Sequence, residues 1–132
     1  MIQENKQLLL KDLCARQPWG VKVQYNNKVY AIDYVSTEYE EVKLNILDNY
    51  TVGISDIKPY LRPMSSMTEE EGIEYLTIDN RAYTCPLDYA HIPASDRIDW
   101  LNAHHFDYQG LIPKGLAIEV NKENNPYEEI NL

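Results

Sequence analysis

The side chains best suited to chemistry lie close together in the C-terminal half of the chain. All three histidines fall within fifteen residues and have carboxylates nearby, and the set is His91, His104, His105, Asp88 and Asp107. Imidazole and carboxylate groups form two-His-one-carboxylate metal sites, so a metal-assisted hydrolase using His91, His104 or His105, and Asp107 is one hypothesis. Adjacent histidines on a helix point about 100° apart, however, and the spacing matches no hydrolase or zinc motif such as H-E-x-x-H. We therefore expect packing and helix-end capping from these residues, and we predict no metal and no other cofactor.

Other catalytic signatures are absent from the sequence. There is no G-x-S-x-G nucleophile elbow and no glycine-rich phosphate loop, and neither Cys14 nor Cys85 has a reactive-cysteine signature beside it. The two cysteines also lack metal or redox spacing, which predicts one buried small apolar residue and one loop thiol. These observations favour a protein that is not an enzyme.

Tyrosine is the more suggestive residue type. Six of the eleven tyrosines lie in or beside residues 20–63, and three glutamates flank Tyr39. Aromatic residues beside acids can form a groove for a peptide or a basic segment. The alternative interpretation is that tyrosine fills the walls of a barrel and keeps its hydroxyl at the rim. The candidate binding residues are the tyrosines of this region and the aromatic and histidine cluster downstream: Tyr34, Tyr39, Tyr60, Trp100, His104, His105, Asp107 and Tyr108.

Charge is unevenly distributed along the 132 residues, whose net charge is −9. Residues 1–62 carry eight bases and eight acids, whereas residues 63–132 carry four bases and thirteen acids. Neither half has the clustered Lys and Arg that neutralise phosphates, so direct nucleic-acid binding is disfavoured. An acidic surface that meets a basic protein partner is permitted, although most charge runs are solvated faces. No apolar run approaches the ~20 residues of a membrane span, and the first residues do not resemble a signal peptide. We therefore expect a cytoplasmic protein that does not bind membranes.

The elements that must position these residues begin with a meander of short strands over residues 20–63. Alternation predicts a first hairpin with a two-residue turn at Asn26-Asn27, because Asn tolerates positive φ. This turn pairs Val23 with Tyr30, and it gathers one set of side chains on one face: Val21, Val23, Tyr30, Ile32 and Tyr34.

A second hairpin is predicted with a three-residue loop, Leu47–Asn49. This loop pairs Val42 with Ile54, Leu44 with Val52 and Ile46 with Tyr50, so that the apolar side chains share one face. Pro59 permits residues 57–61 only as an edge or closing strand. Five short strands with tight hairpins predict a small SH3-like β-barrel, with an OB-like or open-meander arrangement as the alternative.

Helices are predicted on both sides of the meander. Residues 3–16 form a helix closed by Pro18 and Gly20, in which Leu9, Leu10, Leu13 and Cys14 lie on adjoining faces and pack on or plug an open end of the barrel. Ser66 with Glu69, and Thr68 with Glu71, form two capping boxes that begin a helix over about 67–76, with a hairpin over 75–83 as the alternative. Ser95 or Asp96 caps a helix over 97–105, and Asp107 caps a short turn over 108–112. A short strand is expected within 116–120, followed by a flexible polar tail from about 121.

Two segments resemble a known family. They are DIKPYLRPMSSMTEEE, residues 56–71, and WLNAHHFDYQGLIPKGLAI, residues 100–118. Both are similar to an uncharacterised family of small proteins from gut Bacteroides-type bacteria, found in prophage or mobile-element settings. The resemblance implies a cytoplasmic, phage-associated context and carries no established activity.

Together these observations predict an α+β protein in which residues 1–63 form an N-terminal helix and an SH3-like five-stranded barrel. Residues 64–132 form an acidic, mainly helical extension packed on it. The predicted function is a non-enzymatic protein-interaction module of phage or mobile-element origin with a protein partner. The metal-assisted hydrolase is one alternative, and an acidic mimic of nucleic acid that inhibits a host DNA-binding protein is another.

Overall fold

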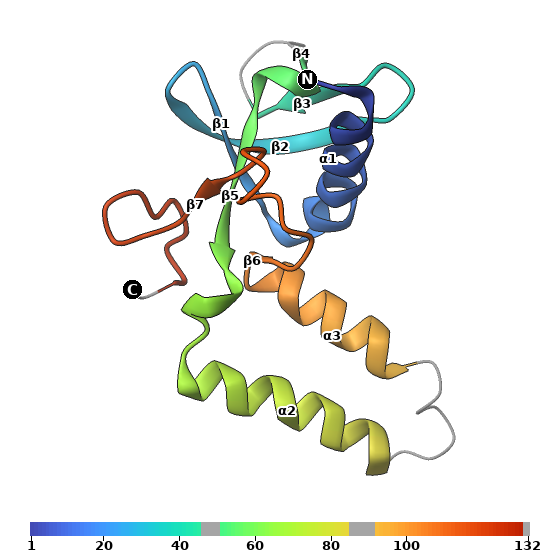
Figure 1. Ribbon diagram of the computed structural model, residues 1–132, viewed down its shortest axis with the longest axis vertical. Helices are drawn as coiled ribbons and strands as arrows, with labels where there is room; N and C mark the ends of the chain where they lie inside the picture. Colours follow the sequence, from blue (N-terminus) through green and yellow to red (C-terminus); the bar gives the residue numbers. More distant parts are fainter. Residues whose placement is uncertain (46–50, 85–91, 131–132) are drawn as a thin grey trace.

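A computed structural model of the protein describes residues 1–45, 51–84 and 92–130. It is an α+β fold in which an N-terminal helix, α1 (Gln3–Arg16), lies beside a mixed sheet. Two further helices, α2 (Glu69–Thr84) and α3 (Ile92–Ala103), form a pair at one end of the molecule (Figure 1). The α+β class and the N-terminal helix are therefore confirmed.

Seven strands of the described residues make one open sheet. They are β1 (Lys22–Tyr25), β2 (Lys28–Ser36), β3 (Glu41–Leu44), β4 (Thr51–Gly53), β5 (Lys58–Pro63), β6 (Phe106–Asp107) and β7 (Ile118–Glu119). Three short 3₁₀ turns accompany them, namely η1 (Gln17–Trp19), η2 (Ile54–Asp56) and η3 (Met64–Ser66). The order is β4-β3-β2-β1-β5-β6, with β7 also paired to β5. The prediction of a closed five-stranded SH3-like barrel is wrong.

The sheet stays open because β5 pairs with strands from the C-terminal half. Its residues are shared among three neighbours: Lys58-Pro59 pair with β1, Tyr60-Leu61 with β7 and Arg62-Pro63 with β6. The pairings with β6 and β7 are parallel, so they require the long connection that α2 and α3 supply. The prediction that Pro59 restricts this segment to an edge or closing strand is wrong, because β5 lies between β1 and β6 in the sheet. Pro59 itself lies in the part of β5 that pairs with β1.

The first hairpin has the predicted turn. Asn26 and Asn27 have φ values of 50° and 63°, and Val23 lies opposite Tyr30. The predicted inner face holds as far as Ile32, where a β-bulge shifts the register between β2 and β3. The extra residue turns Tyr34 outward, so that its side chain is 51% exposed. The prediction that Tyr34 shares the inner face is therefore wrong.

The second hairpin differs from the predicted register by two residues. Val42 lies opposite Val52 instead of Ile54. Because strand side chains alternate with a period of two, this shift keeps the same residues facing inward, and Val42, Leu44, Val52 and Ile54 are all buried. The predicted loop Leu47–Asn49 and the pair of Ile46 with Tyr50 lie outside the described residues.

The α1 helix buries a leucine stripe against the sheet. Leu9, Leu10 and Leu13 belong to one hydrophobic cluster with strand residues such as Val23. Cys14 follows that stripe but is exposed, contrary to its predicted place on the apolar faces, because its side of the helix does not meet the sheet. Cys85 lies outside the described residues.

The helix pair differs from prediction at its boundaries. The α2 helix begins after Thr68, as predicted, but continues to Thr84, so the alternative hairpin over 75–83 is wrong. The α3 helix begins at Ile92, before the predicted caps at Ser95 or Asp96. It ends at Ala103, because His105 has a left-handed φ of 64°. The two helices contact each other, and this packing stabilises helical residues that local helix propensity alone would not predict.

The hydrophobic core contains residues from both sides of position 63. Leu111, Leu116 and Ala117 belong to the same cluster as α1 and the strands. A second cluster joins Ile78 of α2 to Trp100, Leu101 and Phe106. Within the described ranges, no helix is both long and apolar enough to cross a membrane.

Candidate functional site

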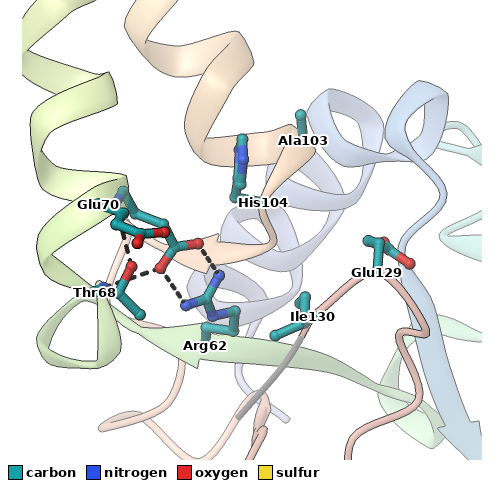
Figure 2. A pocket seen from close by; sticks show the side chains of 8 residues that line it. Arg62, Thr68, Glu70, Ala103, His104, Glu129 and Ile130 are labelled. Carbon is teal, nitrogen blue, oxygen red and sulfur yellow. Dashed lines mark hydrogen bonds and ion pairs between the residues drawn. The ribbon is translucent and has the colours of Figure 1, made fainter.

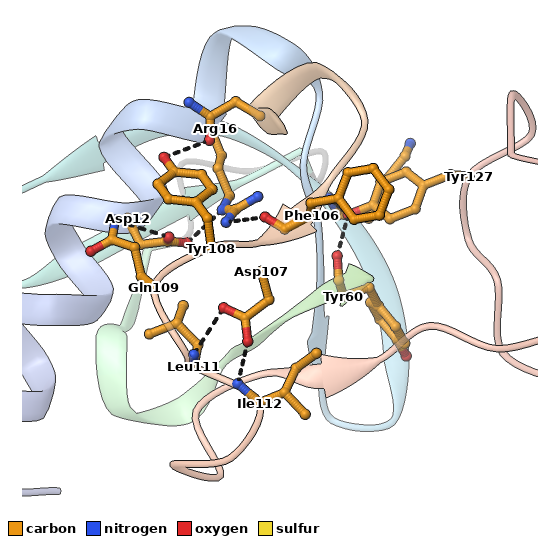
Figure 3. Close-up of polar contacts among 12 residues, drawn as sticks. Asp12, Arg16, Tyr60, Phe106, Asp107, Tyr108, Gln109, Leu111, Ile112 and Tyr127 are labelled. Atoms are coloured by element: carbon orange, nitrogen blue, oxygen red, sulfur yellow. Dashed lines mark hydrogen bonds and ion pairs between the residues drawn. The ribbon is translucent and has the colours of Figure 1, made fainter. Parts of the chain in front are cut away.

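Phe106, at the start of β6, lies among the residues of the predicted aromatic and histidine cluster. Its side chain is fully buried and stacks on Trp100 with ring centroids 5.7 Å apart. The guanidinium of Arg62 lies over the same ring, with its Cζ atom 4.1 Å from the centroid. Arg16 of α1 donates a 2.6 Å hydrogen bond from Nη2 to the backbone carbonyl of Phe106 (Figure 3). One residue thus connects α1, β5 and α3.

A buried ion pair accompanies these contacts. Arg16 donates from Nε to Asp12 at 2.7 Å, and both side chains are fully buried. Burial raises the pKa of Asp12, and Arg16 opposes that shift. Gln109 donates to the other carboxylate oxygen at 3.3 Å, and Arg16 lies over the ring of Tyr108 (Figure 3). These groups are engaged with one another, which assigns them a structural role.

Asp107 caps the following turn, as predicted. Its carboxylate accepts the backbone N–H groups of Leu111 and Ile112, each at 2.9 Å (Figure 3). The side chain is 7% exposed. Both oxygens are therefore used in holding the backbone.

The two histidines point in different directions. The ring of His104 stacks on Trp100 at 4.0 Å, and its Nδ1 lies 2.9 Å from the carbonyl oxygen of Trp100. His105 stacks instead on Tyr127 at 3.7 Å, and its Nε2 lies 3.0 Å from Glu129. The left-handed backbone at His105 causes this divergence.

These contacts do not assemble the hypothetical hydrolase site. His104, His105 and Asp107 each have separate partners, while His91 and Asp88 lie outside the described residues. Across 1–45, 51–84 and 92–130, no group of three His, Cys, Asp or Glu residues is arranged to hold a metal ion.

The predicted binding tyrosines are dispersed. Tyr34 and Tyr39 are 51% and 70% exposed, on β2 and on the connection after it. Tyr60 is 6% exposed and packs with Tyr127. The tyrosines thus form no common groove. Trp100, His104, His105, Asp107 and Tyr108 lie in one neighbourhood, where they pack against neighbouring side chains or accept and donate hydrogen bonds.

A pocket of about 350 Å³ lies next to this cluster (Figure 2). We call it the Arg62 pocket, after the residue at its base. Its lining comes from β5, the start of α2, the end of α3 and the segment after residue 120, which we call the C-terminal arm (121–130). The lining residues are Arg62, Thr68, Glu70, Glu71, Ala103, His104, Glu129 and Ile130.

Arg62 and Glu71 form an ion pair within the Arg62 pocket. Arg62 donates two 2.8 Å hydrogen bonds to Glu71, and these bonds lower the pKa of Glu71 to about 2 (Figure 2). Burial works to raise the pKa of Glu129, but bonds from its own backbone N–H and from His105 lower it overall. Glu70 is exposed at the rim. The lining therefore contains three carboxylates and one guanidinium, which pairs with Glu71, and this excess leaves the pocket negatively charged near neutral pH.

The Thr68–Glu71 capping box positions Glu71. The Thr68 N–H donates to Glu71 at 2.9 Å, and the Glu71 N–H donates to the Thr68 hydroxyl at 3.1 Å. The other predicted box fails, because the Ser66 hydroxyl donates to the Pro63 carbonyl instead.

Sequence reasoning missed Arg62 and Tyr127. Tyr127 is 3% exposed, donates from its hydroxyl to the Tyr60 carbonyl at 2.6 Å and accepts the Lys22 N–H at 3.0 Å. An aromatic residue within a polar tail was the available signal for Tyr127. Arg62 gave no comparable signal, since its ring partner Phe106 is distant in sequence.

No model of a known protein family matches the chain, and comparisons with curated proteins and with solved structures likewise find no match.

Proposed function

We propose that the protein is a non-enzymatic interaction module that binds a basic segment of a partner protein at the Arg62 pocket. The observation that carries the proposal is the excess of carboxylates in a defined concavity. Glu71 is neutralised by Arg62, so Glu70 and Glu129 supply negative charge for an incoming cation. His105 pairs with Glu129 but is buried, and burial lowers its pKa, which keeps its positive charge small at neutral pH.

An arginine or lysine side chain fits this environment. A cavity of about 350 Å³ lies within the ~300–1,000 Å³ range typical of ligand pockets. The end of α3 also contributes, because Ala103 and His104 line the pocket and the C-terminus of a helix carries partial negative charge. Carboxylates can bind guanidinium in a bidentate geometry, which adds orientation to attraction.

The biological setting of the proposal rests on the family resemblance of residues 56–71 and 100–118. These segments meet in space, since β5 pairs with β6 and Arg62 contacts both Glu71 and Phe106. We infer a cytoplasmic protein of phage or mobile-element origin that acts on a basic host or phage protein.

Binding of defined peptides tests the proposal. A labelled peptide of six arginines and a peptide of six glutamates are titrated with the protein at low and moderate salt. The arginine peptide should bind more tightly, and its affinity should fall as salt rises. Equal binding of the two peptides, or no binding of either, refutes the proposal.

Paired variants locate the site. The double variant Glu70→Gln/Glu129→Gln should weaken arginine-peptide binding about tenfold or more, since it removes both unneutralised carboxylates. The control Glu38→Gln/Glu123→Gln removes the same charge at two exposed positions that do not line the pocket. Equal losses from both double variants would show general electrostatic attraction and would overturn the assignment of the site.

The acidic nucleic-acid mimic remains a prediction. Its distinguishing requirement is competition with duplex DNA for a DNA-binding protein. If the wild-type protein and both double variants displace DNA from such a partner equally well, the result favours the mimic over binding at the Arg62 pocket.

A further inference from the structure

A second concavity also reaches the end of α3. It has a volume of about 400 Å³ and is formed by η1, α2 and α3. We call it the Trp19 groove, and its lining residues are Trp19, Ile78, Asp96, Asp99, Trp100 and Ala103. Because Ala103 lines both this groove and the Arg62 pocket, the two concavities adjoin at the last turn of α3.

The Trp19 groove combines an aromatic wall with an acidic rim. Trp19 is 42% exposed, whereas Ile78 and Trp100 are 5% and 8% exposed and form an apolar floor. Asp96 and Asp99 are exposed on α3 at a spacing of three residues, so they lie on the same side of the helix. The Trp100 indole Nε1 is also buried and has no hydrogen-bond partner among the described residues.

This combination has the chemistry of a site for a cationic side chain with an aliphatic stem. Trp is the best ring for a cation–π contact, and neighbouring carboxylates add direct attraction. The apolar floor can cover the methylene groups of arginine or lysine. An exposed tryptophan at the edge of a concavity is also characteristic of residues that dominate protein interfaces.

We propose that the Trp19 groove is a second subsite for the basic partner, taking an arginine or lysine side chain against Trp19 with Asp96 and Asp99 at its rim. The inference rests on the proposed function of the Arg62 pocket. It specifies that the partner segment presents two basic residues, one for each of the two concavities at the end of α3. A segment that occupies both subsites gains affinity through effective concentration without any further contact.

Tryptophan fluorescence provides a selective readout, since the chain has two tryptophans and both line the groove. The probes are a glycine-serine peptide with one arginine and a series with two arginines separated by two to eight residues. The best two-arginine peptide should bind about tenfold more tightly than the one-arginine peptide and should change the tryptophan emission. NMR titration measures the weaker affinities.

Variants separate the two subsites. Asp96→Asn/Asp99→Asn and Trp19→Ala should each abolish the tenfold gain while one-arginine binding at the Arg62 pocket is retained. Trp19→Phe keeps an aromatic ring and should retain most of the gain in affinity. A loss that occurs with alanine and not with phenylalanine would therefore show that the aromatic ring, rather than correct folding, is what the variant removes. The matched control is again Glu38→Gln/Glu123→Gln, which should leave the gain unchanged.

The outcomes distinguish the two proposals. If one-arginine peptides bind and Glu70→Gln/Glu129→Gln weakens them, but the second arginine adds no affinity and no emission change, the second subsite is overturned and the Arg62 pocket stands. If no arginine peptide binds, the proposed function fails and the second subsite fails with it.

Discussion

Arg62 connects the sheet to the helix pair through a single guanidinium. Two of its nitrogens donate to Glu71 near the start of α2, and its planar face lies on Phe106 of β6. The residue is 1% exposed, so its charge depends on these contacts for compensation. Arginine suits this position better than lysine, because its planar fork can bind a carboxylate and stack on a ring at once.

The variant Arg62→Ala should lower the free energy of unfolding by about 2–4 kcal/mol, because it leaves Glu71 unpaired and a space over Phe106. Arg62→Lys should lower it by less, since it keeps the charge but loses the bidentate geometry. Urea denaturation followed by circular dichroism measures both. Lys114→Ala, at an exposed position, should change stability by less than about 0.5 kcal/mol.

The free energy of unfolding that Arg62→Ala removes should depend on pH within a defined range. Arg62 lowers the pKa of Glu71 from its ordinary 4.5 to about 2 in the folded protein. This contribution is therefore complete above pH 4.5 and disappears as the pH falls towards about 2. A difference between wild type and Arg62→Ala that stays constant through this window would contradict the assignment.

His105 should make stability decrease on mild acidification. Burial lowers its pKa from the ordinary 6.5, although Glu129 partly opposes the shift and Arg16 and His104 reinforce it. The unfolded chain therefore takes up a proton first, and stability falls as the pH drops below 6.5. The buried Nδ1 has no hydrogen-bond partner among the described residues, so a second proton there would have no acceptor.

His105→Asn tests this expectation, because asparagine tolerates the left-handed backbone but does not titrate. Between about pH 7.5 and about pH 5.5, the free energy of unfolding should fall more for wild type than for the variant. Identical pH profiles for the two proteins would exclude His105 as the responsible group.

At the scale of elements, the capping box at the beginning of α2 also positions a side chain of the Arg62 pocket. The reciprocal bonds of Thr68 and Glu71 begin α2 shortly after η3, and the same Glu71 carboxylate accepts from Arg62. The helix cap and the ion pair therefore use the same carboxylate, that of Glu71.

Thr68→Ala should lower the free energy of unfolding by about 1 kcal/mol, the usual cost of losing a helix N-cap. Thr77→Ala makes the same substitution at an exposed position inside α2 and should cost less than about 0.5 kcal/mol. Thermal unfolding of the two variants measures the difference. Equal effects would mean that the capping bonds contribute nothing specific.

Tyr127 is the buried aromatic residue of the C-terminal arm, and it bonds the arm to the sheet. The Tyr127 hydroxyl bonds backbone groups of both β5 and β1, and its ring carries His105 on one face. Burial also raises the pKa of Tyr127 well above its ordinary value, so the hydroxyl stays protonated and can donate.

Tyr127→Phe should cost about 1–3 kcal/mol, because the Tyr60 carbonyl and the Lys22 N–H lose a buried partner. Tyr39→Phe, at a residue that is 70% exposed, is the matched control and should be close to neutral. Hydrogen exchange should show faster exchange along residues 121–130 in the Tyr127 variant alone. Unchanged protection of the arm would contradict its attachment through this hydroxyl.

At the scale of the whole molecule, the helix pair projects from the sheet but is joined to it by buried side chains (Figure 1). Phe106 belongs to the helix-pair cluster, yet its carbonyl binds Arg16 of α1 and its ring binds Arg62 of β5. Separate unfolding of the helix pair would take Glu71 from Arg62 and Trp100 from Phe106, whose carbonyl binds Arg16.

We therefore predict one cooperative unfolding transition. Tryptophan fluorescence, which reports on η1 and α3, should change at the same urea concentration as circular dichroism and as amide protection in β5. Loss of the tryptophan signal at a lower urea concentration would show that part of the molecule unfolds independently and would contradict this prediction.

Charge also acts at this largest scale. The net charge of −9 comes from residues 63–132, and two concavities with acidic rims adjoin at the end of α3. Carboxylates concentrated around concave surfaces steer basic ligands towards them, so the negative charge of residues 63–132 would attract the proposed basic partner.

The sequence by itself determined the features whose partners lie within a few residues. These are the N-terminal helix, the Asn26-Asn27 turn, the Thr68–Glu71 capping box and the Asp107 cap. Each depends on backbone conformation or on hydrogen bonds that the local residue types decide.

Only the tertiary structure decided whether the sheet closes, how far α2 extends and which charges pair. β5 joins β6 and β7, residues more than forty positions away, and a bulge after Ile32 turns Tyr34 outward. Such choices depend on packing summed over distant segments, to which no short pattern is sensitive. For the same reason the sequence identified the residues around Trp100–Tyr108, but the pocket beside them required Arg62 and the C-terminal arm to be placed in space.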